Sequence, residues 1–275
     1  MLVRDALKEA ERIVKEAGLE DAAAQYKKDF KRYNEFVAYI AKNYRTNNGR
    51  KPTGSRWRDW CEPWRTLYFE HERIKATDPM AFYVPQNAAS EAFHRSTAFI
   101  RYFRAGNRTS KTQSGYAEHY FYVTGQHRWR EISPPPHDTF IIGINFSQYA
   151  AAVFERKFIT GEEGNALSPM FPQNGKWLHH YDDRKHTITI ACRACANAGE
   201  ARSCTHRKSR IKLFSDEGGW EVLQGGSYVL GHFDEHNDES FFQEALQRVQ
   251  VAKGSSLVVT GTPLHGFEAW EHRRL

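Results

Sequence analysis

The feature that most constrains the fold is the stretch from residue 98 to residue 123, where an apolar strand runs directly into a glycine-containing loop and then a helix. Residues 98–103 (AFIRYF) are mostly apolar and aromatic, which is typical of a buried strand. Residues 112–123 follow as the helix. More strands and helices alternate downstream, a pattern typical of a sheet whose strands are joined by covering helices. The sequence therefore predicts an α/β fold with a mostly parallel sheet.

The other expected elements come in the same order of strand and then helix. They are a strand over 139–145 (TFIIGIN) with a helix over 148–158, a strand over 228–233 (YVLGHF) with a helix over 239–251, and a strand over 256–260 (SLVVT). Residues 175–215 are predicted to be more antiparallel, with HTITIA and SRIKLFS as strands. Residues 76–275 are thus expected to form one α/β core.

Residues 1–75 have a different pattern and are expected to form a helical N-terminal subdomain. Val3, Leu7 and Val14 fall at helical spacing, and so do Phe30 and Val37 further along. The chain has no run of about 18 apolar residues, so we expect no membrane span and a cytosolic protein. The formal net charge of +6 suits a polyanionic partner such as a nucleotide or a nucleic acid.

The loop after the first strand has the spacing G-x-x-x-x-G-K-[ST], with Ala105 and Ser110 at the two glycine positions. Backbone N–H groups in such a loop, together with the start of the next helix, form a site for phosphate. Lys111 would reach the phosphates, the Thr112 hydroxyl would bind Mg²⁺, and Gly106 would let the backbone approach closely. The alternative is an ordinary strand–turn–helix with a surface lysine. The remaining loop residues are Asn107, Arg108 and Thr109.

An acidic pair, Asp234 and Glu235, ends the apolar strand over residues 228–233. A carboxylate at this position beside a phosphate loop can support Mg²⁺, and the next one can activate the attacking water as a general base. The alternative is an N-cap for the helix that follows. Because the phosphate loop precedes the pair, the sequence favours a nucleotide-hydrolysing site.

The last strand ends in small polar residues, Thr260, Gly261 and Thr262. A strand next to the acidic pair with hydroxyl groups at its end could sense the terminal phosphate and pass that state to the rest of the chain. The alternative is a plain strand and turn. We interpret the segment as a coupling element because the two other motifs are present.

A cluster of metal-ligand residues lies between the strands HTITIA and SRIKLFS. Cys192, Cys195, Cys204 and His206 have the spacing C-x₂-C-x₈-C-x-H. Two short-spaced ligand pairs across a loop can surround a tetrahedral zinc ion. The sequence therefore predicts a zinc-stapled hairpin insertion at residues 190–208. The alternative is three free thiols in a loop.

These motifs, in this order, resemble the ATPase half of a bacteriophage large terminase, the motor that packages DNA. The resemblance covers about residues 80–275. It rests on four segments: Val84-Pro85-Gln86-Asn87 with Phe93, the arginine-containing loop from Arg104 to Thr112, Gly231-His232-Phe233-Asp234-Glu235, and Thr260-Gly261-Thr262-Pro263-Leu264-His265-Gly266. Ser110 departs from the family, which usually has glycine there.

The resemblance implies a P-loop NTPase fold of the ASCE or RecA-like type, with ATP and Mg²⁺ as cofactors. It implies contact of Gln86 with adenine and of Arg108 with phosphates, with Glu235, Lys111 and Arg108 catalytic. Residues 105–112 would bind the nucleotide, Thr112 and Asp234 would hold Mg²⁺, and Thr260, Gly261 and Thr262 would couple hydrolysis to movement.

The implied partners are double-stranded DNA, the portal protein, the small terminase subunit and further copies in a homo-oligomeric ring, all in the cytoplasm of an infected bacterium. A nuclease domain is expected to be absent. Two other functions stay open from the sequence: a helicase-type ATPase, and a regulatory module that binds a nucleotide with little turnover.

Overall fold

The structure, a computed structural model, describes residues 73–74, 76–106, 109–143, 149–161, 169–235, 239–249 and 252–262. The chain divides into two compact units, Met1–Lys75 and Ala76–Leu275. All elements named below lie in the second unit. The helical pattern expected over residues 1–75 falls almost entirely outside the described residues. Within the described part, no helix has both the length and the hydropathy needed to cross a membrane.

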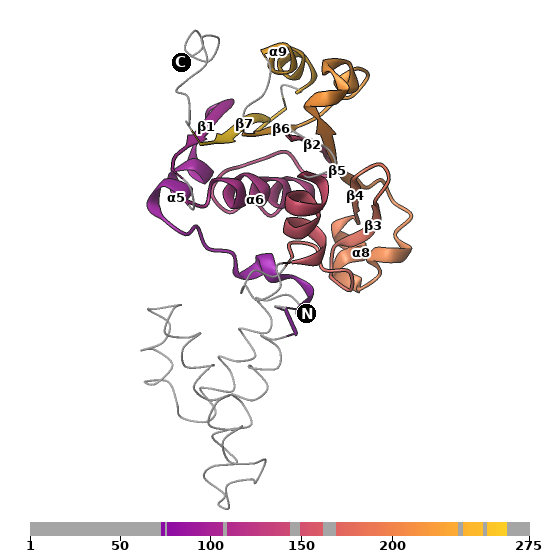
Figure 1. Cartoon of the computed structure of the whole chain (residues 1–275). Helices are drawn as coiled ribbons and strands as arrows, with labels where there is room; N and C mark the ends of the chain where they lie inside the picture. Colours follow the sequence, from indigo (N-terminus) through magenta and orange to yellow (C-terminus); the bar gives the residue numbers. More distant parts are fainter. Residues whose placement is uncertain are drawn as a thin grey trace, which may run out of the picture. The chain divides into compact units, whose positions relative to one another are not determined.

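Seven strands form one sheet in the order β1-β7-β6-β2-β5-β4-β3. The strands are β1 (Ile100–Arg104), β2 (Asp138–Gly143), β3 (Leu178–Asp182), β4 (Thr187–Ile190), β5 (Ser209–Ser215), β6 (Leu230–Asp234) and β7 (Ser256–Gly261). Strands β1, β7, β6, β2 and β5, in this order, pair in parallel with one another. Strands β4 and β3 pair antiparallel at the β5 side of the sheet (Figure 1). The expected α/β class with a mostly parallel sheet is confirmed.

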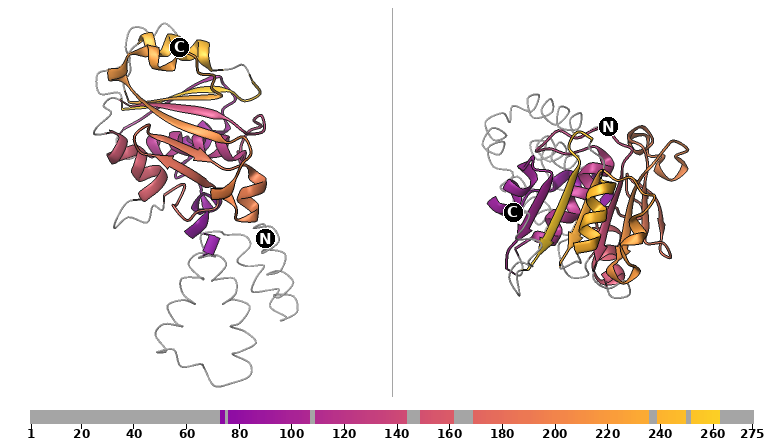
Figure 2. Two further views of the ribbon diagram at one scale, coloured as in Figure 1. Left: turned by 90° about the vertical axis from the view of Figure 1, so that its right-hand side faces the viewer. Right: turned by 90° about the horizontal axis from the view of Figure 1, so that it is seen from above.

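Helices cover both faces of this sheet, with α6 on one face and α9 on the other (Figures 1 and 2). The α-helices are α5 (Ala88–Arg95), α6 (Lys111–Thr124), α8 (Arg193–Ala198) and α9 (Glu239–Arg248). The short 3₁₀ segments are η1 (Pro79–Phe82), η3 (Ala201–Ser203), η4 (Asp216–Gly218) and η5 (Trp220–Leu223). η2 (Ala150–Thr160) has π-helical hydrogen bonds, such as Gly161 N–H to Arg156 C=O, where an ordinary helix was expected.

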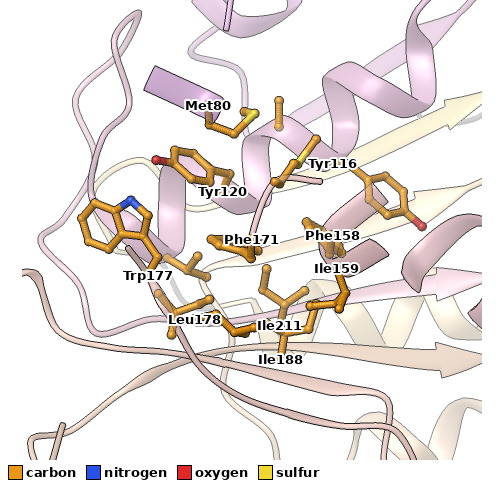
Figure 3. Close-up of a cluster of buried hydrophobic side chains, with 14 of the residues drawn as sticks. Met80, Tyr116, Tyr120, Phe158, Ile159, Phe171, Trp177, Leu178, Ile188 and Ile211 are labelled. Atoms are coloured by element: carbon orange, nitrogen blue, oxygen red, sulfur yellow. The ribbon is translucent and has the colours of Figure 1, made fainter. Parts of the chain in front are cut away.

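The central strands are apolar on both sides because both of their faces are covered. Phe140 and Ile142 of β2 pack in the cluster with α9, whereas Ile141 packs in the cluster with α6. The larger cluster lies between α6, η2 and the β3–β5 side of the sheet (Figure 3). Aromatic rings dominate it, and Tyr120 stacks on Phe171 at 5.3 Å between ring centroids. This core supports α6 along its length and thereby positions the loop before it.

Most strands begin or end within about two residues of the sequence-based expectation, a difference that is usual for element ends. β5 matches SRIKLFS and β6 covers the end of YVLGHF. α5 and β3 were not anticipated. The segment between HTITIA and SRIKLFS is not a simple hairpin, because α8 and η3 lie between β4 and β5.

Candidate functional site

The carboxyl ends of the parallel strands lie at one edge of the sheet, which is where α/β proteins bind ligands. β7 lies between β1 and β6. Its register pairs Arg104 with Gly261 on one side and Asp234 with Thr260 on the other. The loop after β1, the acidic pair after β6 and the polar end of β7 are therefore neighbours. The order of the strands in the sheet thus brings these three sequence motifs together.

The loop between β1 and α6 folds around the side chain of Lys111. Lys111 Nζ donates to the carbonyl of Gly106 at 2.7 Å, and the Thr109 hydroxyl donates to the same carbonyl at 2.8 Å. Lys111 is only 6% exposed. In the described part of the chain, no carboxylate forms an ion pair with it. A buried ammonium group whose partner is one backbone carbonyl is suited to an anionic ligand.

The backbone conformation of Ser110 is one that glycine adopts more easily than other residues. Its backbone is left-handed, with φ 69° and ψ 14°, a conformation that costs a non-glycine residue about 1 kcal/mol or more. Ser110 occupies the N-cap of α6, yet its side chain makes no capping hydrogen bond. The positive end of the α6 dipole therefore faces the loop without a side-chain cap, as an anion site requires.

Asp234 ends β6 inside a ring of hydroxyl groups. Its Oδ1 accepts from Thr260 Oγ1 at 2.5 Å and from Thr112 Oγ1 at 3.5 Å, and its Oδ2 accepts from Tyr149. The side chain is 2% exposed, and burial raises the pKa of this carboxyl although the three hydroxyl groups oppose the rise. The ring connects the first turn of α6 to the ends of β6 and β7.

Glu235 follows directly and has a left-handed backbone, with φ 68°. Its N–H donates to the Thr260 carbonyl at 2.7 Å, and its Oε2 accepts from the Thr262 N–H at 3.1 Å. Left-handed backbone at a non-glycine residue is typical of functional positions held by their surroundings. Here the end of β7 holds the carboxylate beyond the strand ends.

Thr260 also contacts His232 behind the acidic pair. Because its hydroxyl donates to Asp234, Thr260 accepts from His232 Nε2 at 2.7 Å. Burial lowers the pKa of His232 to about 3, so the ring is neutral and can carry its proton on Nε2. A Cβ on Gly115 of α6 would lie 2.4 Å from the His232 ring and 3.1 Å from Thr260. Glycine at 115 therefore lets α6 approach this group closely.

The segment before α5 lies beside the loop that follows β1. Gln86 Oε1 accepts from the Ser110 hydroxyl, and Asn87 Nδ2 donates to the Thr109 carbonyl at 3.3 Å. Asn87 also caps α5, because its Oδ1 accepts from Ser90 N–H at 2.8 Å. The cap and the loop contact together hold Gln86 next to the loop between β1 and α6.

The structure thus brings most of the predicted site residues together at one edge. They are Gln86, Ala105, Gly106, Thr109, Ser110, Lys111, Thr112, Asp234, Glu235, Thr260, Gly261 and Thr262. Asn107, Arg108 and residues 263–266 lie outside the described residues, so their predicted roles stay predictions. Cys192, Cys195, Cys204 and His206 form a separate group between β4 and β5.

Two members of this site, Tyr149 and His232, were missed from the sequence. His232 precedes Asp234 by two residues on β6, and residues two apart on a strand share a face. That spacing was a usable signal. Tyr149 follows β2, and only the strand order β6-β2 shows that the end of β2 adjoins Asp234. Its phenol also accepts from the Tyr116 hydroxyl at 2.9 Å, which connects the ring of hydroxyls to α6.

Fold and site together define an α/β protein with a lysine-containing loop after β1 and an acidic pair after β6. No protein-family model and no curated protein matches the sequence. Among solved structures, the chain is similar to the large terminase ATPase domain of Thermus phage P74-26, with 17% identity, TM-score 0.47, and coverage of 71% of this chain and 70% of that one.

The chain is also similar to the large terminase of a thermophilic bacteriophage, with 15% identity and TM-score 0.38, covering 69% of this chain and 38% of that one. A second structure of that terminase, in complex with ADP, gives 15% identity, TM-score 0.34 and the same coverage. At this level of similarity, nothing about the activity of the present chain follows.

Proposed function

We propose that this chain is the ATPase domain of a viral DNA-packaging terminase, which hydrolyses ATP to drive double-stranded DNA into a procapsid. The observation that carries the ATPase proposal is the meeting of three strand ends. The loop after β1 leads to Lys111, Thr112 and the start of α6, which has no side-chain cap. The end of β6 carries Asp234 and Glu235, and Thr260 of β7 donates a hydrogen bond to Asp234. Phosphate-binding, metal-binding and carboxylate groups thereby face one place.

The residues fit the binding of a nucleoside triphosphate. Lys111 is buried, and among the described residues its ammonium group donates to the Gly106 carbonyl, a contact that phosphate oxygens would replace with a gain in charge pairing. The backbone N–H groups at the start of α6 would donate to the same phosphates. Gln86, which contacts the loop through Ser110, would face the adenine side.

The residues also fit Mg²⁺, whose oxygen ligands lie about 2.1 Å from the metal and therefore roughly 3 Å from one another. Thr112 Oγ1 and Asp234 Oδ1 are 3.5 Å apart, so these two side chains would together hold the ion. The bound ion would neutralise phosphate charge. Glu235 would then orient the attacking water and accept its proton.

The end of β7 would couple hydrolysis to movement. Thr260 contacts the side chain of Asp234, and Thr262 N–H contacts that of Glu235, so a shift in either carboxylate reaches β7 directly. Under this proposal the chain works as a homo-oligomeric ring with double-stranded DNA, the portal protein and the small terminase subunit, in an infected bacterium. The net charge of +6 favours the polyanionic partner.

The first test is ATP binding and phosphate release by the purified chain. We expect ATP with Mg²⁺ to raise the melting temperature, because a ligand that binds the folded state stabilises it. We also expect phosphate release to depend on Mg²⁺ and to rise when copies assemble with DNA. Binding without turnover in every assembly state would favour the regulatory module. No stabilisation by ATP would contradict a nucleotide site.

The second test concerns DNA and is independent of the first. Contacts of lysine and arginine with phosphate release counterions, so affinity falls as salt rises. We expect the dissociation constant for random-sequence double-stranded DNA to rise at least about tenfold between about 50 and about 200 mM salt, with little dependence on sequence. Fluorescence anisotropy at several salt concentrations measures this. A dissociation constant independent of salt would contradict the DNA part of the proposal.

A further inference from the structure

A second group of side chains with ligand chemistry lies between β4 and β5. Cys192 occupies the N-cap of α8, Cys195 lies in its first turn, and Cys204 and His206 follow η3. One ligand atom from each residue can be chosen so that all four lie within 4.8 Å of one another. Residues fourteen positions apart in the chain are thus folded around one point.

The distances match a tetrahedral metal site. His206 Nδ1 lies 3.4 Å from Cys192 Sγ and 3.3 Å from Cys195 Sγ. A zinc ion with Zn–S of about 2.3 Å and Zn–N of about 2.0 Å in a tetrahedron separates sulfur from nitrogen by about 3.5 Å. The Cys195 N–H also donates to Cys192 Sγ at 3.5 Å, so the start of α8 holds these two sulfur atoms on the same side of the segment.

Hydrogen bonds alone do not give the three sulfur atoms and the His206 ring nitrogen good partners. The single Nδ1 of His206 lies against two sulfur atoms, and one ring nitrogen can accept only one hydrogen bond well along its lone pair. A thiol is a weak donor and a weak acceptor. A metal ion at the centre instead gives each of the four atoms the same partner.

The segment also lacks a core of its own. The hydrophobic cluster there consists of Ala191, Ala201 and the buried Cys204, with Cys192 and Cys195 packed against it. α8 has six residues and η3 has three. Elements this short, with so little apolar surface, are usually held by disulfides or a metal.

Strand direction places this group far from the phosphate site. The segment ends where β5 begins, at Ser209, and β5 runs parallel to β2 and β6. The group therefore adjoins the amino ends of the parallel strands, whereas the phosphate loop follows a carboxyl end. Four protein ligands also leave no open position for a substrate in a tetrahedral site.

We propose that Cys192, Cys195, Cys204 and His206 hold one zinc ion that maintains the fold of residues 191–208 and takes no part in phosphate chemistry. Three sulfur ligands and one imidazole in a tetrahedron are the donor set that zinc prefers. Because the site is built from one segment, its loss should unfold that segment and leave the sheet intact. This inference does not depend on the ATPase proposal.

The test is metal analysis of the full chain purified without chelators, for wild type and three variants. We expect about one zinc per chain in wild type and in Thr205→Ala, which alters the same loop without removing a ligand. We expect His206→Cys to keep the zinc, because it preserves four ligands. Cys195→Ser should lose at least about nine tenths of it.

Two further readouts distinguish this site from an accidental ion. Replacement by Co²⁺ should give the intense visible absorption of tetrahedral cobalt thiolate, in wild type and not in Cys195→Ser. Removal of the metal should speed amide hydrogen exchange within residues 191–208 while ATP affinity stays unchanged. If Cys195→Ser does not fold, the metal content and the cobalt spectrum of the wild-type chain still test the proposal. Three results would overturn the proposal: less than about a tenth of an equivalent of zinc per wild-type chain, bound iron in place of zinc, or faster amide hydrogen exchange throughout the sheet after the metal is removed.

Discussion

Replacement of Glu235 by glutamine is expected to lower the maximal rate of ATP hydrolysis by roughly 10²- to 10⁴-fold, the usual contribution of a general base. ATP affinity should change by less than about threefold, because an interaction made only in the transition state affects turnover and not substrate binding. Glutamine keeps the size of the side chain and can still accept from the Thr262 N–H, but it cannot take a proton.

The geometry around Glu235 explains why no neighbour is expected to replace it. Asp234, the adjacent carboxylate, is buried and its oxygens are engaged by Thr260, Thr112 and Tyr149. Glu235 is held farther out by the Thr260 carbonyl and the Thr262 N–H, at the position where a strand end meets solvent. Under the proposed function, Asp234 would support Mg²⁺ and Glu235 would act on water.

Two comparison variants make this result decisive. Glu217→Gln removes an exposed carboxylate of η4, which is not among the predicted site residues, and should leave the rate within about twofold of wild type, since exposed substitutions usually have small effects. Lys111→Ala should instead weaken ATP binding, because it removes the buried ammonium group. Phosphate release in the assembled, DNA-stimulated state is the measurement. Turnover by Glu235→Gln equal to that of wild type would remove this residue from the mechanism.

The parts of this site that could be predicted from the sequence are the motifs made of consecutive residues. The loop from Ala105 to Thr112 and the pair Asp234–Glu235 each lie next to an apolar strand, so both the motif and its surroundings are local. The hydroxyl ring around Asp234 is not local. Tyr149 is 85 residues away from Asp234, and only the pairing of β6 with β2 makes them neighbours. Register and strand order are properties of the folded sheet.

The fold shows the same division between local and non-local information. The buried strands were found because parallel strands covered on both faces are continuous apolar runs. β3 (LHHYD) was missed because it is the outermost strand, and an edge strand with histidines and an aspartate lacks that signal. The π-helical hydrogen bonding of η2 was also missed, since its sequence has the spacing of an ordinary helix. Glu118 of α6 is fully buried, which is rare for a glutamate and is not signalled by the local sequence.

Glu118 supports the second large effect, because it is the centre of a buried ion-pair network. It accepts from Arg101 Nη2 at 2.7 Å, from His94 Nδ1 at 2.6 Å and from His127 Nε2 at 3.3 Å. Arg101 of β1 in turn donates to Ser256 Oγ at 2.9 Å, so the network joins α5, α6, β1 and β7. Burial alone would raise the pKa of Glu118, but Arg101 and the two histidines hold it well below its usual range.

Glu118→Ala is therefore expected to lower the free energy of unfolding by about 3–5 kcal/mol, because it leaves Arg101 buried without its partner. Glu118→Gln should be nearly as destabilising, since it keeps the volume and loses the charge. The exposed pair of Glu91 with Arg95 on α5 provides the matched control, and Glu91→Ala should cost less than about 1 kcal/mol. Urea unfolding followed by circular dichroism gives each value.

The dependence on pH separates this electrostatic effect from a simple packing defect. A carboxyl whose pKa is lower in the folded state stabilises the fold above its unfolded pKa, about 4.3 for glutamate, and that contribution disappears as pH falls through the folded pKa. The difference between wild type and Glu118→Gln should thus be constant near neutral pH and shrink in acid. A difference that is unchanged by acid, or no larger than that of Glu91→Ala, would show that the network contributes little. Arg101 and Ser256 connect this network to β1 and β7, the strands that lead to the Lys111 loop and to Thr260. Under the proposed function, weakening the network should therefore also reduce ATP affinity.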